Sequence, residues 1–259
     1  MTTSHGTVAR KVRQYQGTAA LLFVVTCGLL VGCALTPAAK LHLYLPDSLA
    51  TADGTHERFE AVTQNQVHAA LLLRWDSASP GSAPPVSEVL FQSMVERLRL
   101  QIEKEIPIKV VTVLEPDLIE PGSGSSRIIQ IAQEGSVPYL IVGILSSVEI
   151  DSPLSVPLSL ESVYVLGTRT ENYTLAELAL LDGGDGRVLL YAQGRGYMRL
   201  DRPDGEQQSN LYPVIQRSEG ESPIYPDPVR AEDVLRGVTG REALEQAVHL
   251  LKDAWKRKT

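Results

Sequence analysis

The stretch YTLAELALLDGGDGRVLLYAQ, residues 173–193, says most about the fold of this 259-residue chain. Two apolar runs of strand length, 173–181 and 187–193, flank the sequence Asp182-Gly183-Gly184-Asp185-Gly186. Asp-Gly and Gly-Gly pairs supply the positive φ angles that tight hairpin turns require, so we expect two antiparallel strands joined here. The same turn lacks the alternating oxygen ligands and closing glutamate of an EF-hand loop, which favours a turn over a calcium site.

Three further apolar runs precede this hairpin, at residues 67–75, 108–114 and 139–145. The segment 86–105 between the first two is predicted to be a helix, and 127–134 has the length of a short one. Continuous apolar strands that alternate with helices are typical of parallel strands buried on both faces. The apolar spacing that predicts the first helix is carried by Phe91, Val95, Leu98 and Ile102.

A last helix is predicted near the end of the chain. Thr239 and Glu242 have the spacing of a capping box, which places the start of the helix at Thr239. Its apolar stripe is Leu244, Val248, Leu251 and Trp255. The expected fold class is therefore α/β (α+β): a mixed sheet of about five strands, with three helix-linked strands followed by a hairpin and helices packed on the sheet. Residues 67–259 are expected to form a single domain.

The first 32 residues have the three parts of an export signal. A basic stretch without acidic residues leads into the apolar run 18–30, and small residues follow. The run is shorter than the roughly 20 apolar residues that span a membrane. It ends in Leu30-Val31-Gly32-Cys33, which resembles the lipobox of bacterial lipoproteins. This resemblance implies cleavage between Gly32 and Cys33 and acylation of Cys33, as with palmitate. An uncleaved signal anchor and an ordinary secreted protein are the alternatives.

The residues that follow the lipobox-like sequence indicate the membrane in which the protein is expected and the segment that joins the lipid to the domain. Cys33 is followed by Ala34 and not by aspartate. By resemblance to lipoprotein sorting in Gram-negative bacteria, this favours the outer membrane, with the domain facing the periplasm. Residues 33–66 are weakly periodic and contain Pro37 and Pro46, so we expect the lipidated cysteine to be followed by a tether, with a short helix around 56–65.

Charge and cysteine content restrict the partners and cofactors. The chain has 24 Lys+Arg and 31 Asp+Glu; the signal removes three basic residues, leaving 21 against 31 and a net charge near −10. An acidic surface repels phosphate backbones, so nucleic acid is not expected as a partner. Because Cys27 leaves with the signal and Cys33 carries lipid, no thiol remains for a disulfide or a thiolate metal site.

The order of elements also resembles a known group of domains. Tyr139-Leu140-Ile141-Val142-Gly143 stands before a variable insertion, and Leu178-Ala179-Leu180-Leu181-Asp182 leads through the glycine turn to Arg187-Val188-Leu189-Leu190-Tyr191. This arrangement looks like the periplasmic α/β domain of the curli secretion-channel lipoprotein, of lipoprotein activators of penicillin-binding proteins and of rhombotarget lipoproteins. The resemblance covers residues 67–197 and the last helix. It implies a role in envelope assembly or partner binding and lends the chain no catalytic residue.

No sequence pattern of an active site is found. His56-Glu57 lacks the second histidine of a helical zinc-protease motif. Glu245 and His249 stand one helical turn apart without a visible third ligand, which favours a surface pair over a metal site. We therefore expect a protein that is not an enzyme and that has no cofactor and no metal.

Two segments are candidates for partner contact. Residues 151–168 alternate apolar and polar side chains and are interrupted by Pro153 and Pro157, so we interpret them as a flap that packs either on a partner or on its own sheet. The polar, proline-rich stretch 198–230 is expected to be a disordered loop or a docking segment. The candidate contact residues of the flap are Leu154, Val156, Leu158 and Tyr164.

These features predict a non-enzymatic envelope lipoprotein, anchored in the membrane through Cys33, that binds or positions another envelope component. The alternative is a subunit of a homo-oligomeric secretion or assembly complex, in which the flap forms the contact. A cell-wall-acting enzyme is the third possibility, and no residue constellation supports it.

Overall fold

The computed structural model describes residues 37–46, 67–78, 80–157, 164–204, 213–217 and 220–258. The predicted signal and lipobox, and the short helix expected around 56–65, lie outside these ranges. The described elements are, in chain order, α2 (Leu41–Tyr44), β1 (Val67–Asp76), α4 (Glu88–Glu105), β2 (Ile108–Leu114), η2 (Pro116–Leu118), α5 (Gly124–Glu134), β3 (Tyr139–Pro157), β4 (Tyr164–Asp182), β5 (Val188–Pro203), β6 (Val214–Gln216), η3 (Pro228–Arg230) and α6 (Ala231–Lys258).

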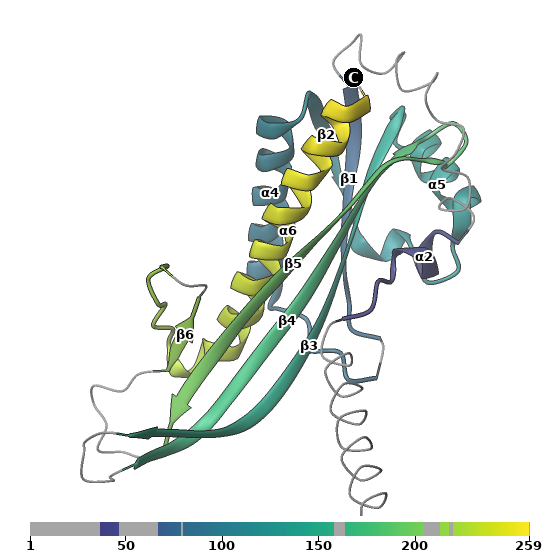
Figure 1. Ribbon diagram of the computed structural model, residues 1–259. Coiled ribbons are helices and arrows are strands. Elements are labelled where there is room, and N and C mark those ends of the chain that lie inside the picture. The colour runs from purple at the N-terminus through teal and green to yellow at the C-terminus, as the bar shows by residue number, and fades with distance from the viewer. Residues whose placement is uncertain are drawn as a thin grey trace, which may run out of the picture. The chain divides into compact units, whose positions relative to one another are not determined.

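Six described strands form one mixed sheet in the order β2-β1-β3-β4-β5-β6 (Figure 1). β1 pairs in parallel with β2 and β3, whereas β3 to β6 pair antiparallel. The predicted fold class is confirmed, with one strand more than the five expected. The glycine turn joins β4 to β5 as predicted, and Gly186 has a φ of 71° that favours glycine.

Helices cover both faces of the sheet at the end where β1, β2 and β3 lie side by side (Figure 1). On one face α4 and α6 pack against alternate strand residues, among them Leu71 and Leu178. On the other face α2 and α5 pack against Leu72 and Val142. β1 and residues 140–145 of β3 therefore have the predicted burial on both faces. The same expectation is wrong for β2, an edge strand whose residues Lys109, Val111 and Val113 are exposed on one face.

The central strands are much longer than the sequence predicted. β3 and β4 are 19 residues each and stay paired from Tyr139↔Asp182 to Pro157↔Tyr164. The segment predicted to be a separate flap, 151–168, is therefore the far end of this hairpin, although residues 158–163 lie outside the described chain. β1 ends at Asp76, opposite Ser146, so no described strand pairs with the outer edge of β3 at Pro153. Proline is tolerated at such an unpaired edge.

The last helix begins eight residues before the predicted start. α6 runs from Ala231 to Lys258, so Thr239 lies inside it and is not an N-cap. The Thr239 hydroxyl donates to the carbonyl of Leu235 at 2.7 Å, a bond that threonine makes within a helix. The capping-box interpretation of Thr239 and Glu242 is therefore wrong, whereas the predicted apolar stripe from Leu244 to Trp255 is buried.

Parts of the proline-rich stretch 198–230 are ordered. β5 continues to Pro203, and β6 pairs with it at Leu200↔Ile215. Met198, Leu200 and Ile215 form a small apolar cluster with Leu235 of α6. The expectation of a disordered loop is thus wrong for these residues, because alternate apolar side chains bury against the first turns of α6; residues 205–212 and 218–219 lie outside the described chain.

Part of the segment expected to be a tether also belongs to the fold. Within 37–46, Leu41, Tyr44 and Leu45 are 0%, 1% and 0% exposed and join the core on the α5 face. Residues 47–66 are outside the described ranges.

Candidate functional site

The predicted site residues are distributed as follows. Gly32, Cys33 and Leu158 lie outside the described residues. Leu154 is buried, with 4% of its surface exposed, in the paired part of β3. The backbones of Val156 and Tyr164 pair with Val165 and Pro157 near the end of the hairpin. The buried Leu154 is therefore not presented as a contact residue by the described chain.

One stretch of β4 and β5 carries aromatic and charged side chains on the face away from α6. On this side of the sheet the described helices, α2 and α5, pack against the other end of the strands (Figure 1). Alternate residues of a strand share a face, and the register Tyr173↔Tyr197 brings the two strands together. We call Glu171, Tyr173, Arg195 and Tyr197 the open face.

The two tyrosines of the open face form a pair held by one carboxylate. Their ring centroids lie 4.7 Å apart, with planes tilted by 34°. Both hydroxyls donate to Glu171, at 3.0 Å from Tyr173 and 3.2 Å from Tyr197. Burial and the neighbouring Glu171 raise the pKa of Tyr173 to about 12, and the same causes raise the pKa of Tyr197. Both phenols therefore stay neutral near pH 7 and remain hydrogen-bond donors.

The open face is both accessible and structurally fixed. Tyr197 is 42% exposed. Next to it, the guanidinium of Arg169 forms two contacts with Asp201, at 2.6 and 3.1 Å, which tie β4 to β5. This bidentate pair raises the pKa of Arg169, so the cation persists at any physiological pH. The result is a tyrosine pair held in place on paired strands, next to the exposed Arg195.

The same face contains a buried charged cluster closer to α2. The Lys40 amine lies 2.9 Å from Asp76, and the two side chains are 8% and 4% exposed. Glu177, 2% exposed, accepts the backbone N–H groups of Lys40 and Leu41 at 2.5 and 2.9 Å. Its second oxygen accepts the Tyr191 hydroxyl at 2.7 Å. The charges in this cluster are mutually satisfied, which is typical of a structural contact.

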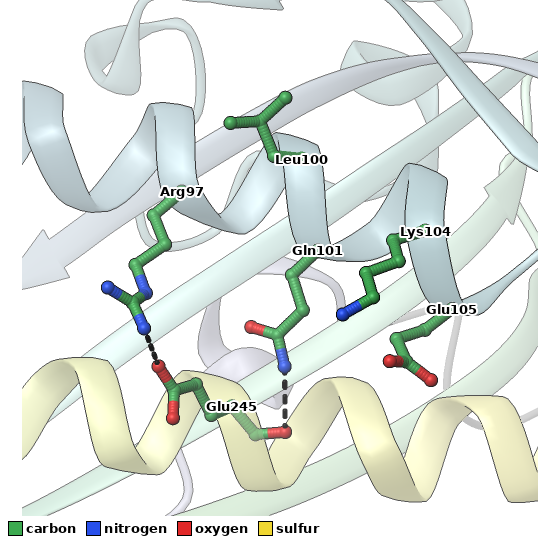
Figure 2. Close-up of a pocket in the computed structure, with 6 residues that line it drawn as sticks. All are labelled: Arg97, Leu100, Gln101, Lys104, Glu105 and Glu245. Carbon is green, nitrogen blue, oxygen red and sulfur yellow. Dashed lines mark hydrogen bonds and ion pairs between the residues drawn. The ribbon is translucent and has the colours of Figure 1, made fainter.

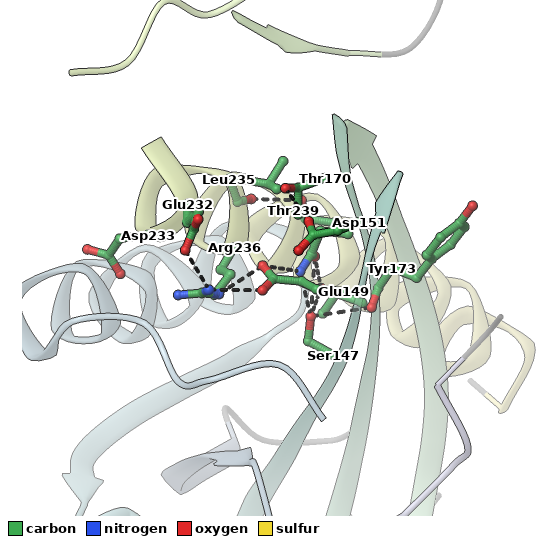
Figure 3. A network of polar contacts seen from close by, with 12 residues as sticks. Ser147, Glu149, Asp151, Thr170, Tyr173, Glu232, Asp233, Leu235, Arg236 and Thr239 are labelled. Atoms are coloured by element: carbon green, nitrogen blue, oxygen red, sulfur yellow. Dashed lines mark hydrogen bonds and ion pairs between the residues drawn. The ribbon is translucent and has the colours of Figure 1, made fainter. Parts of the chain in front are cut away.

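On the opposite face a polar network fastens α6 to the hairpin (Figure 3). The guanidinium of Arg236 binds Glu149 with two bonds of 2.8 and 2.9 Å. Asn172, fully buried, donates to both Glu149 and Ser147. Because α6 covers these groups and they satisfy one another, we interpret the network as structural.

A groove of about 300 Å³ lies between α4 and α6 (Figure 2). Arg97 pairs with Glu245 across it at 3.0 Å, and the Gln101 amide donates to the Glu245 carbonyl at 3.4 Å. Lys252 of α6 binds Glu105 of α4. Ligand pockets are mainly apolar with a few converging polar groups, and this groove is instead bridged by its own polar side chains, so we assign it no ligand. Its lining is Arg97, Leu100, Gln101, Lys104, Glu105 and Glu245.

Within the described ranges, no group of three or more His, Cys, Asp or Glu side chains is placed to hold a metal ion. The Glu245 side chain pairs with Arg97, whereas His249 lies 3.9 Å from Asp253. Glu245 and His249, whose spacing suggested a pair with each other, thus each lie next to a different side chain.

Neither the open face nor the Lys40 cluster was found from the sequence. The open face depends on β4 and β5 continuing past the predicted strand ends, so that Tyr173 meets Tyr197. The Lys40 to Glu177 contact joins residues 137 positions apart, a separation that strand and helix periodicity does not address. The available signal was the run from Tyr191 to Arg199, in which polar or aromatic residues alternate with alanine, glycine and methionine.

Comparison with known proteins leaves the family open. No protein-family model matches the chain, and no curated protein matches it. Among solved structures, a neuraminyllactose-binding hemagglutinin homolog from Helicobacter pylori is similar at 9% identity and a TM-score of 0.36, over 75% of this chain and 86% of that one. A hypothetical protein from Chlamydia trachomatis has 6% identity and a TM-score of 0.32, over 74% and 98%. A PelC dodecamer from Paraburkholderia phytofirmans has 9% identity and a TM-score of 0.27, over 70% and 90%.

Proposed function

We propose that the chain is a non-enzymatic lipoprotein of the bacterial envelope, anchored through an acylated Cys33 and facing the periplasm from the outer membrane. In this proposal it binds or positions another envelope component, a protein, through the open face. The lipobox-like sequence Leu30-Val31-Gly32-Cys33 supports the anchor. No described helix is long and apolar enough to cross a membrane.

The observation that carries the binding role is the composition and rigidity of the open face. Tyrosine and arginine are the residues most enriched at the energetic centres of protein interfaces. Here Tyr173, Tyr197 and Arg195 stand on paired strands, and Glu171 holds the hydroxyls of both tyrosines. Side chains already fixed before binding lose little conformational entropy when a partner docks. A protein partner therefore fits this surface better than a small molecule, which would need an enclosed pocket.

Replacing Cys33 by serine tests the anchor. Because the thioether-linked lipid cannot form, Cys33→Ser should remain an unprocessed precursor in the inner membrane. Fractionation of the envelope followed by mass measurement gives the readout. A Cys33→Ser chain that is cleaved and reaches the outer membrane would show that the lipoprotein proposal is wrong.

A photo-crosslinking amino acid placed at Tyr197 tests the binding surface. In intact envelopes it should capture a discrete partner, and adding Arg195→Glu should abolish capture, since the exposed cation would be reversed. The matched control is the same amino acid at Tyr225, which is 65% exposed and lies outside the open face. Equal capture from both positions, or capture that survives Arg195→Glu, would contradict a role for the open face.

A homo-oligomeric subunit is the second candidate, and the edge of β2 favours it. β2 is the first strand of the sheet, so its outer edge has no partner among the described strands. Val111 and Val113 on this strand are 48% and 42% exposed. Exposed apolar edge strands readily pair with a second chain. The detergent-solubilised protein should then be larger than a monomer, and Val111→Lys should reduce it to one.

A further inference from the structure

The chain near the predicted lipid site is held by buried charges. Lys40 and Asp76 form an ion pair that is almost completely buried. The Lys40 amine also donates to the Ser82 hydroxyl at 3.3 Å. Two successive backbone N–H groups, of Lys40 and Leu41, bind the buried carboxylate of Glu177. Releasing the segment would leave Asp76 and Glu177 buried without these partners, which is strongly unfavourable.

Apolar contacts hold the same segment. Leu41, Tyr44 and Leu45 are at most 1% exposed and belong to one cluster with Ile128 and Ile131 of α5. The guanidinium of Arg74 lies 5.7 Å from the centre of the Tyr44 ring, within the range of a cation–π contact. Burial, together with the neighbouring Asp76, raises the pKa of Tyr44, so the ring system stays neutral. The segment is therefore packed as part of the core.

The sequence distance from this segment to Cys33 is short. Only residues 34–36 separate Cys33 from Pro37, the first described residue. Four residue steps span at most about 14 Å, and the seven steps to Lys40 at most about 25 Å. A free tether from Cys33 to Val67 would instead reach about 120 Å when fully extended.

We propose that residues 37–45 clamp the lipidated end of the mature chain to β1 and β4, so that the domain is held directly at the lipid surface. This inference rests on the proposed acylation of Cys33. Only residues 34–36 then separate the acylated cysteine from the clamped segment, and residues 47–66 add nothing to the reach of the domain.

Linker insertions distinguish the clamp from a long tether. A Gly-Ser linker of about 20 residues, roughly 25 Å on average, is inserted either between Thr36 and Pro37 or between Thr51 and Ala52. The acylated full chain is reconstituted in phosphatidylethanolamine vesicles that carry a dansyl headgroup label. The two native tryptophans, Trp75 and Trp255, both belong to the described domain and serve as energy donors.

The clamp predicts that only the insertion at Thr36 lowers energy transfer from tryptophan to the dansyl lipid. Opening the clamp with Leu41→Ser and Leu45→Ser should then make the insertion at Thr51 effective as well. Equal loss of transfer from both insertions in the otherwise unchanged chain, or no loss from the insertion at Thr36, would overturn the clamp. Hydrogen exchange at the Lys40 and Leu41 amides gives a second readout, because free amides would contradict the Glu177 contacts.

The experiment distinguishes a failure of the clamp from a failure of the proposed lipid anchor. Acylation is read separately, from the mass of the vesicle-bound chain. A chain that begins at Ala34, without the signal and without Cys33, is the reference that should neither join the vesicles nor show transfer with any linker. Acylated protein that stays membrane-bound but responds equally to both insertions would refute the clamp and leave the lipoprotein proposal intact.

Discussion

Two glycines of β5 allow α6 to lie directly on the strand backbone. A Cβ added at Gly194 would come within 2.0 Å of the Ala243 carbonyl oxygen, and one at Gly196 within 2.2 Å of the Thr239 oxygen. These are backbone atoms of a packed helix, which cannot move aside as a flexible side chain would. The absence of side chains at two alternate positions therefore fixes how close α6 and β5 can approach.

The first residue-scale prediction follows from this contact. Gly194→Ala should destabilise the domain by about 3 kcal/mol or more, because overpacking forces α6 away from the sheet. The matched control is Gly237→Ala in α6, where the new Cβ would meet only Leu90 at an ordinary 3.5 Å. Replacing a helical glycine by alanine there should stabilise by about 0.5–1 kcal/mol. Urea unfolding of both variants checks that their free energies of unfolding change in opposite directions. Similar changes in the two variants would contradict the close approach of α6 to β5.

Single side chains also protect the outer edge of β5. The Gln246 amide oxygen accepts the backbone N–H of Arg195 at 2.5 Å, and Glu242 accepts that of Tyr197. Burial, with Glu221 nearby, raises the pKa of Glu242. Residues one helical turn apart on α6 thus bind alternate N–H groups of a strand, which blocks edge-to-edge pairing over this stretch.

At the scale of elements, the sequence predicted strand and helix types better than their ends. The strands at 108–114 and at the glycine turn were placed correctly, because apolar runs and turn residues are local signals. The lengths of β3 and β4 were not predicted, because alternation in 151–168 fits either a separate flap or a continuing half-buried strand. Only the pairing partner resolves this, and pairing is a long-range property.

The start of α6 was missed for a related reason. Gly237 and Gly240 lower the helix propensity of the first turns, and Thr239 with Glu242 mimics a capping box. Burial of Leu235 with Met198 and Leu200 outweighs this local signal. Tertiary packing decided the boundary, as it commonly does for amphipathic helices.

Neighbouring leucines near the end of α6 provide the element-scale prediction. Leu251 is fully buried, whereas Leu250 is 42% exposed. Leu251→Ala should cost about 2–5 kcal/mol through lost burial and a cavity under α6. Leu250→Ala should change stability by less than about 0.5 kcal/mol. Thermal unfolding of the pair would measure the difference; equal melting temperatures would show that this part of α6 does not pack on the sheet.

At the scale of the whole domain, helices cover one end of the β3–β4 hairpin more completely than the other. At one end, residues 140–145 of β3 are buried between α5 on one face and α6 with α4 on the other. Farther along, residues 148–153 are only partly buried or exposed. There α6 contacts them through the Glu149–Arg236 pair, and Ser82 forms an isolated bridge with Val148. Local stability follows buried contacts, so the two ends should open with different free energies.

Hydrogen exchange across β3 tests this difference. Amides in 140–145 should exchange only by global unfolding, whereas those in 149–152 should also exchange by local opening of the hairpin.

Arg236→Leu should weaken the far end by about 3 kcal/mol, the lower limit for a buried pair, since Arg236 and Glu149 keep 11% and 16% exposure. Exchange should therefore rise in 149–152 with a smaller change in 140–145. The control Arg97→Leu removes an exposed ion pair with Glu245. It should change the free energy of opening of each segment by less than about 1 kcal/mol. If Arg236→Leu raised exchange equally in both segments, β3 would open as one cooperative unit, and the unequal helix cover would not produce unequal local stability.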